Sequence, residues 1–190
     1  FAGVFAYTLS RFSGSEKVFF NLIEDGRGHI DLSRSVGMFV KTLPVLMDCK
    51  NQDLDNFLAY SSKLINSVMK YDLYPFRILA GKYGLSANIM FQYSHDLYAG
   101  AVKNDGLDYE IEELDHDLSA DFSFDVLNNG DGRLTIRTVG SSLYGWDFIH
   151  RFAQSYKMIL RGMMEAERLG DIPYISKDDL AFLDKYNQTE

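Results

Sequence analysis

The sequence has one cysteine, no cluster of basic residues and no long apolar run, and each absence excludes a class of protein. Cys49 alone cannot form a disulfide within the chain or a multi-cysteine metal site, and it fits a reducing, cytoplasmic compartment. The 19 basic and 27 acidic side chains give a net charge of −8, which argues against a nucleic-acid surface. No apolar run reaches the roughly 18 residues of a membrane span. We therefore expect neither nucleic acid nor a membrane as a partner.

What the chain does have is enough apolar sequence to bury a substantial core. Its 190 residues are 46% hydrophobic and 24% charged, which excludes wholesale disorder and a coiled-coil composition. The length is typical of about one domain. The apolar helical pattern is already running at Phe1, with no initiator Met and no signal peptide. We expect the chain to be a piece cut from a larger protein.

Hydrophobic periodicity predicts alternating helices and strands in the first half of the chain. Asp25–Gly28 is a turn, and Pro44 predicts a bend or a sheet edge because proline cannot donate to a ladder. Asp53 is the expected N-cap of the clearest helix. The predicted elements are a helix over 1–12, strands over 17–24 and 36–48, and a helix over 53–70.

The second half predicts a short helix, further strands and a long helix. Pro75 stands in the first turn of the short helix, Asn128–Gly132 is a hairpin turn, and Ser176 with Asp179 caps the last helix. The predicted elements are a helix opened by Tyr74-Pro75-Phe76 and ended by Gly84, strands over 88–93, 122–127 and 134–139, a helix over 146–168, a linker over 170–173 and a final helix. Residues 105–121 are acidic, and residues 110–117 within them are interpreted as a solvated strand edge. The resulting order is α-β-β-α-α-β-β-β-β-α-α.

Residue chemistry alone reveals no active site. Ser94-His95-Asp96 has the residue types of a nucleophilic triad, but adjacent side chains at a strand end do not converge. Asn128–Gly132 is explained by a hairpin and lacks the glutamate of a calcium loop. Gly81-Lys82 lacks the flanking residues of a phosphate loop. The histidines show no metal-ligand spacing: His29, His95, His116 and His150.

A set of short motifs nevertheless points to a known family. Val36–Pro44 (VGMFVKTLP) closely resembles the fifth core motif of the condensation domains of nonribosomal peptide synthetases, and Asp25–Gly28 is similar to the segment before that motif. Asp72–Phe76 (DLYPF) is similar to the sixth motif. The remaining similar segments are Asn88–Tyr93, Phe122–Asp125 through Leu143-Tyr144, and Ser176–Thr189, which resembles the linker into an adenylation domain. The ordered set covers essentially the whole chain.

The resemblance implies an α/β (α+β, two-layer) fold: a chloramphenicol-acetyltransferase-like half-domain with a mixed sheet packed against helices. The family's catalytic signature, His-His-x-x-x-Asp-Gly, lies in its amino-terminal lobe, and no such string occurs in this chain. Residues 1–170 are therefore expected to form the carboxy-terminal lobe, with 171–190 as the linker and short helix toward an adenylation domain. By the same resemblance, the chain is expected to be inactive without the amino-terminal lobe.

In the family, an aminoacyl amine attacks a peptidyl thioester in a tunnel between two lobes, and both substrates ride on carrier-protein phosphopantetheine arms. The implied role of this chain is one wall of that tunnel, with no catalytic residue, no directly bound cofactor and no metal. The implied partners are the amino-terminal lobe, carrier domains and an adenylation domain. The residues expected to contact substrate are Gly37, Phe39, Lys41, Thr42 and Tyr74.

Alternatives remain open for the site and for the function. Gly37 can instead relieve a strand twist, and Phe39 and Phe76 can be core residues. Lys41 departs from the asparagine common in the family, and lysine offers only donors and a charge. The function can also be that of a non-catalytic module docking carrier or adenylation domains, or of an epimerisation-type relative. An acyltransferase that uses coenzyme A is disfavoured by the tail at 176–189.

Overall fold

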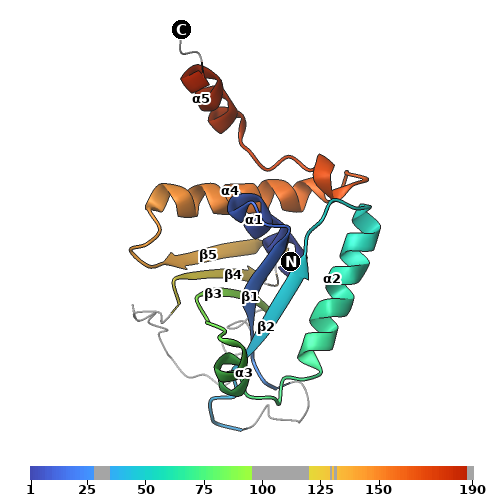
Figure 1. Ribbon diagram of the computed structural model, residues 1–190, viewed down its shortest axis with the longest axis vertical. Coiled ribbons are helices and arrows are strands. Elements are labelled where there is room, and N and C mark those ends of the chain that lie inside the picture. The colour runs from blue at the N-terminus through green and yellow to red at the C-terminus, as the bar shows by residue number, and fades with distance from the viewer. Residues whose placement is uncertain (28–34, 96–119, 129, 131, 188–190) are drawn as a thin grey trace, which may run out of the picture. The chain divides into compact units, whose positions relative to one another are not determined.

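The computed structural model describes residues 1–27, 35–95, 120–128, 130 and 132–187, and the chain divides into two compact units. The first, called here the helical unit, comprises Phe1–Phe19, Leu46–Ser67 and Gly145–Glu190. The second, the sheet unit, comprises Phe20–Val45 and Val68–Tyr144. Figure 1 labels the helices and strands of both.

A mixed five-stranded sheet, whose strands lie largely in the sheet unit, has the order β2-β1-β3-β4-β5. The strands are β1 (Lys17–Glu24), β2 (Lys41–Asp48), β3 (Ile89–His95), β4 (Phe122–Asn128) and β5 (Leu134–Gly140) (Figure 1). β3 pairs in parallel with β1 and β4, whereas β4 and β5 form an antiparallel hairpin. Strand alternation places Phe20, Phe91 and Phe124 on one face, and all three are buried. The Phe91 ring lies 6.3 Å from that of Phe20 and 6.5 Å from that of Phe124. The α+β class predicted from the sequence is confirmed.

Helix α1 is the centre of the helical unit. The unit contains α1 (Ala2–Ser13), most of α2 (Leu54–Met69), α4 (Trp146–Gly162), the short 3₁₀ turn η1 (Leu169–Asp171) and α5 (Lys177–Asn187). The ring of Tyr7 on α1 lies 6.4 Å from that of Phe57 on α2. On α1, Phe5 and Phe12 place their rings 5.7 and 5.1 Å from Phe152 on α4. Aromatic pairs at these separations stabilise beyond the area they bury, so α1 joins α2 to α4.

Most local signals in the sequence are confirmed. Asp53 Oδ1 accepts a hydrogen bond from Asn56 N–H at 3.1 Å, and Ser176 Oγ accepts one from Asp179 N–H at 3.0 Å. Gly84 ends α3 (Phe76–Tyr83) in the left-handed conformation. Residues 105–119 of the acidic stretch lie outside the described residues, and so does the strand that the sequence predicts there.

The strand predicted over 36–48 begins only at Lys41, so residues 36–40 belong to no strand. The backbone carbonyls of this segment have another donor. Arg27 donates from its guanidinium to Ser35 O at 3.3 Å and to Gly37 O at 3.4 Å. Because Arg27 satisfies two carbonyls at the start of the segment and most of its residues are exposed to water, the segment does not need a ladder partner. The apolar, β-branched composition alone gave no sign of this long-range donor.

Two helix boundaries also differ from the prediction. The long helix ends at Gly162 rather than at residue 168, because Glu167 O and Leu169 N–H bond to Leu54 and Gln52 instead of continuing the helix. Pro75 is the N-cap of α3, one position before the first helical residue. Its extended backbone conformation there suits a residue with a fixed φ.

Substituting Phe57 tests whether α2 is held by its contact with α1. Phe57 is fully buried, and the next residue, Leu58, is 41% exposed. Phe57→Ala is expected to lower the free energy of unfolding by about 3–5 kcal/mol, because it removes a large buried side chain and leaves a cavity. Leu58→Ala is the matched control and should cost roughly 1 kcal/mol or less. Urea unfolding followed by circular dichroism measures both, and equal costs would contradict the described packing.

Candidate functional site

A tight approach between two backbone segments organises the region that the sequence motif predicts as the site. Gly26 follows β1 with φ of +71°, and a β-carbon placed on it would lie 1.7 Å from the carbonyl oxygen of Phe39. No side chain fits in that space. The turn Glu24–Arg27 therefore packs directly against the backbone that leads into β2.

Arg27 fixes the other side of the same contact. Its guanidinium lies over the ring of Phe39 at 4.6 Å while it donates to the carbonyls of Ser35 and Gly37. Its backbone N–H donates to Asp25 Oδ1 at 2.9 Å. A planar guanidinium can stack and donate at once, which an ammonium cannot do in the same geometry. Arg27 therefore sets the path of residues 35–39.

Glu24 closes this turn through its side chain. Its Oε2 accepts a hydrogen bond from Gly26 N–H at 2.7 Å. Burial raises the pKa of the Glu24 carboxyl, the bond from Gly26 opposes this, and Asp25 and the charge of Asp72 raise the pKa further. Asp72, in the turn before α3, is itself buried.

The five predicted site residues fall into two groups. Gly37 is exposed and outside any strand, so it does not relieve a strand twist, and its absent β-carbon would lie 3.2 Å from the Phe39 ring. Phe39 and Lys41 are half-buried, and Lys41 Cε lies 3.2 Å from the position of a β-carbon on Gly26. The structure brings these three together around the 24–27 turn. The other two are Thr42, which is half-buried on β2 next to Lys41, and Tyr74, which is half-exposed before α3.

A polar row across the sheet was missed by the sequence analysis. Gln92 on β3 is in register with Asp125 on β4, and Asp125 is in register with Arg137 on β5. Arg137 Nε donates to Asp125 Oδ2 at 3.1 Å, and Ser123 Oγ donates to Asp125 Oδ1 at 3.1 Å. By alternation this row is on the sheet face opposite Phe91 and Phe124. The Phe-Ser-Phe-Asp alternation of β4 was the sequence signal that Asp125 lies on the polar face. Its partner Arg137 is defined only by the register of the hairpin.

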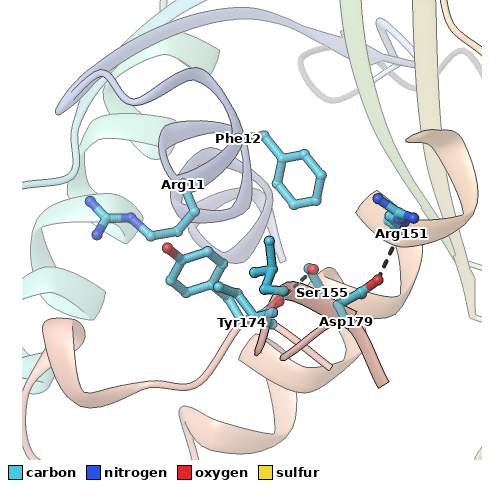
Figure 2. Close-up of a pocket in the computed structure, with 8 residues that line it drawn as sticks. Arg11, Phe12, Arg151, Ser155, Tyr174 and Asp179 are labelled. Carbon is cyan, nitrogen blue, oxygen red and sulfur yellow. Dashed lines mark hydrogen bonds and ion pairs between the residues drawn. The ribbon is translucent and has the colours of Figure 1, made fainter. Parts of the chain in front are cut away.

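The helical unit holds a pocket of about 250 Å³ between α1, α4 and the segment that leads into α5 (Figure 2). Its polar residues are engaged with one another. Ser155 Oγ donates to Tyr174 O at 2.5 Å, Arg151 Nε lies 3.4 Å from Asp179 Oδ1, and Arg11 lies 5.9 Å from the Tyr174 ring centroid. The pocket is therefore the place where residues 174–183 attach to the helical unit, and its lining offers no catalytic set.

Among the described residues, the other motifs considered in the sequence supply no reactive group. Ser94 is buried and accepts a hydrogen bond from Gln92 Nε2 at 2.9 Å, while Asp96 and the histidine side chains at 29, 95 and 116 lie outside the described residues. His150 is exposed on α4 beside Gln154. In the part of the chain that the structure describes, no three His, Cys, Asp or Glu side chains gather as a metal site. In the same part, no helix combines the length and apolar character needed to cross a bilayer.

Comparison with known proteins gives one family. The family model described as the condensation domain matches residues 1–176. Tyrocidine synthase 3 of Brevibacillus parabrevis is 26% identical over 162 residues, which are 80% of this chain and 2% of that protein. Gramicidin S synthase 2 of Brevibacillus brevis is 27% identical over 107 residues, which are 56% of this chain and 2% of that protein. The chain thus spans a small part of each relative.

Solved structures of the same family share the fold. The starter condensation domain of the rhizomide synthetase RzmA superposes with a TM-score of 0.70 at 16% identity, covering 92% of this chain and 43% of that chain. A four-domain nonribosomal peptide synthetase bound to AMP and glycine gives a TM-score of 0.76 at 14% identity, covering 93% of this chain and 15% of that chain. The epimerization domain from the third module of tyrocidine synthetase B gives a TM-score of 0.67 at 19% identity, covering 86% of this chain and 40% of that chain.

Two glycines test the backbone contact at the site. Both Gly26 and Gly84 have positive φ, but a β-carbon on Gly84 would meet nothing within 4 Å. Gly84→Ala is expected to cost about 1–2 kcal/mol of unfolding free energy through backbone strain alone. Gly26→Ala should cost about 2–5 kcal/mol, because the clash with Phe39 O adds to the strain. Urea unfolding of both variants separates the two, and equal losses would show that the close approach is absent.

Cys49 tests whether the one thiol is chemically inert. It is buried, and burial raises its pKa to about 12, with the charge of Asp48 adding to the rise and Arg11 opposing it. The reactive thiolate is therefore scarce at neutral pH. Iodoacetamide at about pH 8 is expected to leave the folded chain unlabelled and to label it in concentrated urea, as measured by mass spectrometry. A second thiol in Lys50→Cys, at an exposed position, should react in the folded state. If Cys49 were alkylated in the folded state as fast as the cysteine introduced in Lys50→Cys, the described burial of Cys49 would be contradicted.

Proposed function

Because the chain belongs to the condensation domain family, we propose that it forms the carboxy-terminal lobe of such a domain in a nonribosomal peptide synthetase. It supplies one wall of the tunnel in which the amine of one carrier-bound aminoacyl group attacks the thioester carbonyl of another. A C–N bond forms, the C–S bond breaks, and the amine proton leaves with the freed thiol. The observation that carries the proposal is the family match over residues 1–176.

The extent of the similarity supports a division of the chain into lobe and linker. An isolated condensation domain of the family is matched over 43% of its length by 92% of this chain, as expected for one of two lobes. Residues 1–170 form the lobe in this proposal. Residues 171–190, which include α5, form the linker toward an adenylation domain, and the family match ends at 176.

The site residues act by positioning and by excluding water. Gly37 leaves space for the phosphopantetheine arm of a carrier, and Phe39, Thr42 and Tyr74 line its path. Lys41, held at the start of β2 beside Gly26, donates a hydrogen bond to a carbonyl or anionic group of the arm. Orienting two reactants in this way lowers a barrier by several kcal/mol without any catalytic side chain. The catalytic histidine motif is supplied by the amino-terminal lobe.

Epimerisation is the second candidate, because an epimerization domain has the same fold with a TM-score of 0.67. The two reactions leave different products on the carriers. Condensation joins two aminoacyl groups into one amide, whereas epimerisation inverts a stereocentre and joins nothing. A docking module without chemistry gives neither product.

The test is an amide-forming assay with loaded carrier domains, followed by mass spectrometry and chiral chromatography. The chain alone is expected to form no product, and the domain containing both lobes is expected to form the amide. In that domain Lys41→Ala should reduce kcat/KM about tenfold, since it removes a donor to the substrate. Lys50→Ala, at an exposed position two residues beyond the same strand, is the control and should have no effect. An inverted stereocentre without an amide would assign the domain to epimerisation. If neither product formed, both proposals would be overturned.

A further inference from the structure

Arg27 is the side chain that connects the turn after β1 to the loop of residues 35–39. Its Nη1 donates a hydrogen bond to Ser35 O at 3.3 Å, and its Nη2 donates one to Gly37 O at 3.4 Å. The loop belongs to no strand, so these bonds stand where a neighbouring strand would supply backbone N–H groups. One planar fork therefore holds two carbonyls of the loop that are two residues apart.

The ring of Phe39 carries the hold of Arg27 into the loop. The guanidinium carbon of Arg27 lies 4.6 Å from the ring centroid, and two ring atoms lie 3.2 and 3.3 Å from the place of a β-carbon on Gly37. Val36 and Met38, on either side of Gly37, are 103% and 90% exposed, so they contribute little packing. The position of Gly37 therefore depends on the contacts of Arg27 and Phe39.

These contacts of Arg27 need a guanidinium and not only a positive charge. A guanidinium can lie over an aromatic ring while its N–H groups donate within its own plane. A lysine ammonium is a compact point charge, and it cannot bond two carbonyls and cover the ring in the same geometry. Arg27 turns one face and two of its nitrogens toward the protein. Its role can therefore be separated experimentally from that of a cation that binds substrate.

We propose that Arg27 is a positioning residue for amide formation, which acts through Phe39 and Gly37 without touching the substrate. The proposal rests on the proposed function, in which Gly37 and Phe39 border the path of the phosphopantetheine arm. A loop held in one position orients the arm and its thioester before the amine attacks. Without Arg27 the loop samples other positions, and a smaller fraction of the bound substrate is oriented for attack. The chemical step then slows, whereas binding of the arm changes little.

The test measures amide formation by variants of the domain that contains both lobes. Arg27→Lys and Arg27→Ala are both expected to lower kcat about tenfold and to change KM by less than about twofold, because orientation is lost and binding is kept. Arg161→Lys, at an exposed position on α4, is the control and should have no effect. A wild-type kcat in Arg27→Lys overturns the proposal, because the charge alone then suffices. A raised KM with kcat retained also overturns it, because Arg27 then binds the substrate directly.

Two further measurements separate positioning from a general loss of folding. Guanidinium chloride at about 20 mM is expected to restore kcat of Arg27→Ala severalfold, because the free ion can stack on Phe39 and donate to the same carbonyls, whereas urea at the same concentration should not. The double variant Arg27→Lys/Phe39→Leu should be no slower than the slower of its two single variants, because both residues act on one loop. Absence of rescue, or fully additive losses in the double variant, would overturn the proposal.

If the wild-type domain forms no amide, the proposed function fails, and the hold of Arg27 on an arm-binding loop is measured separately. A nitroxide spin label is attached at Met38→Cys, an exposed position in the loop, while Cys49 is buried. Electron paramagnetic resonance should show that the label is more mobile in Arg27→Lys than with Arg27 present, and that added pantetheine restrains it only when Arg27 is present. A label that is equally mobile in both proteins, or that does not respond to pantetheine in either, overturns the inference.

Discussion

The candidate site depends on one steric constraint, the absence of a side chain at Gly26. The carbonyl of Phe39 occupies the space where a β-carbon would stand, so the backbone of the turn after β1 packs directly against the backbone that leads into β2. Arg27 then spans the same two segments with two hydrogen bonds and a ring contact. Gly37 and Phe39 are placed by this arrangement rather than by a strand, and Lys41 follows as the first residue of β2. The candidate site is therefore largely a loop held by one turn, which explains how it can be preorganised without a ladder.

Local signals in the sequence predicted most of the elements. Asp53, Ser176 and Gly84 mark helix ends through interactions within four residues, and such short-range chemistry is readable from a sequence. The start of β2 was not readable, because the donor to Ser35 and Gly37 is a side chain eight and ten residues away. The end of α4 was missed for a similar reason, since its continuation bonds to residues 52 and 54.

In the candidate site, too, some residues were predicted from the sequence and others were not. The motif residues Gly37, Phe39 and Lys41 were predicted from a resemblance, and the structure brings them together. The Asp125–Arg137 pair was not predicted, because it needs the hairpin register that only pairing of β4 with β5 defines. In that pair the carboxylate is mostly buried and the guanidinium is 43% exposed, so one partner is fixed while the other reaches solvent. Charged groups in such pairs are seldom recognisable from one sequence, because burial depends on the whole sheet.

The buried Cys49 has a practical consequence for work on this protein. It is the only cysteine in the chain, and burial raises the pKa of its thiol to about 12. The folded chain should therefore serve as a cysteine-free background toward thiol reagents. A cysteine introduced at any exposed position becomes the single attachment point for a fluorophore or spin label, so distances and motions can be followed without first removing a native residue from the core.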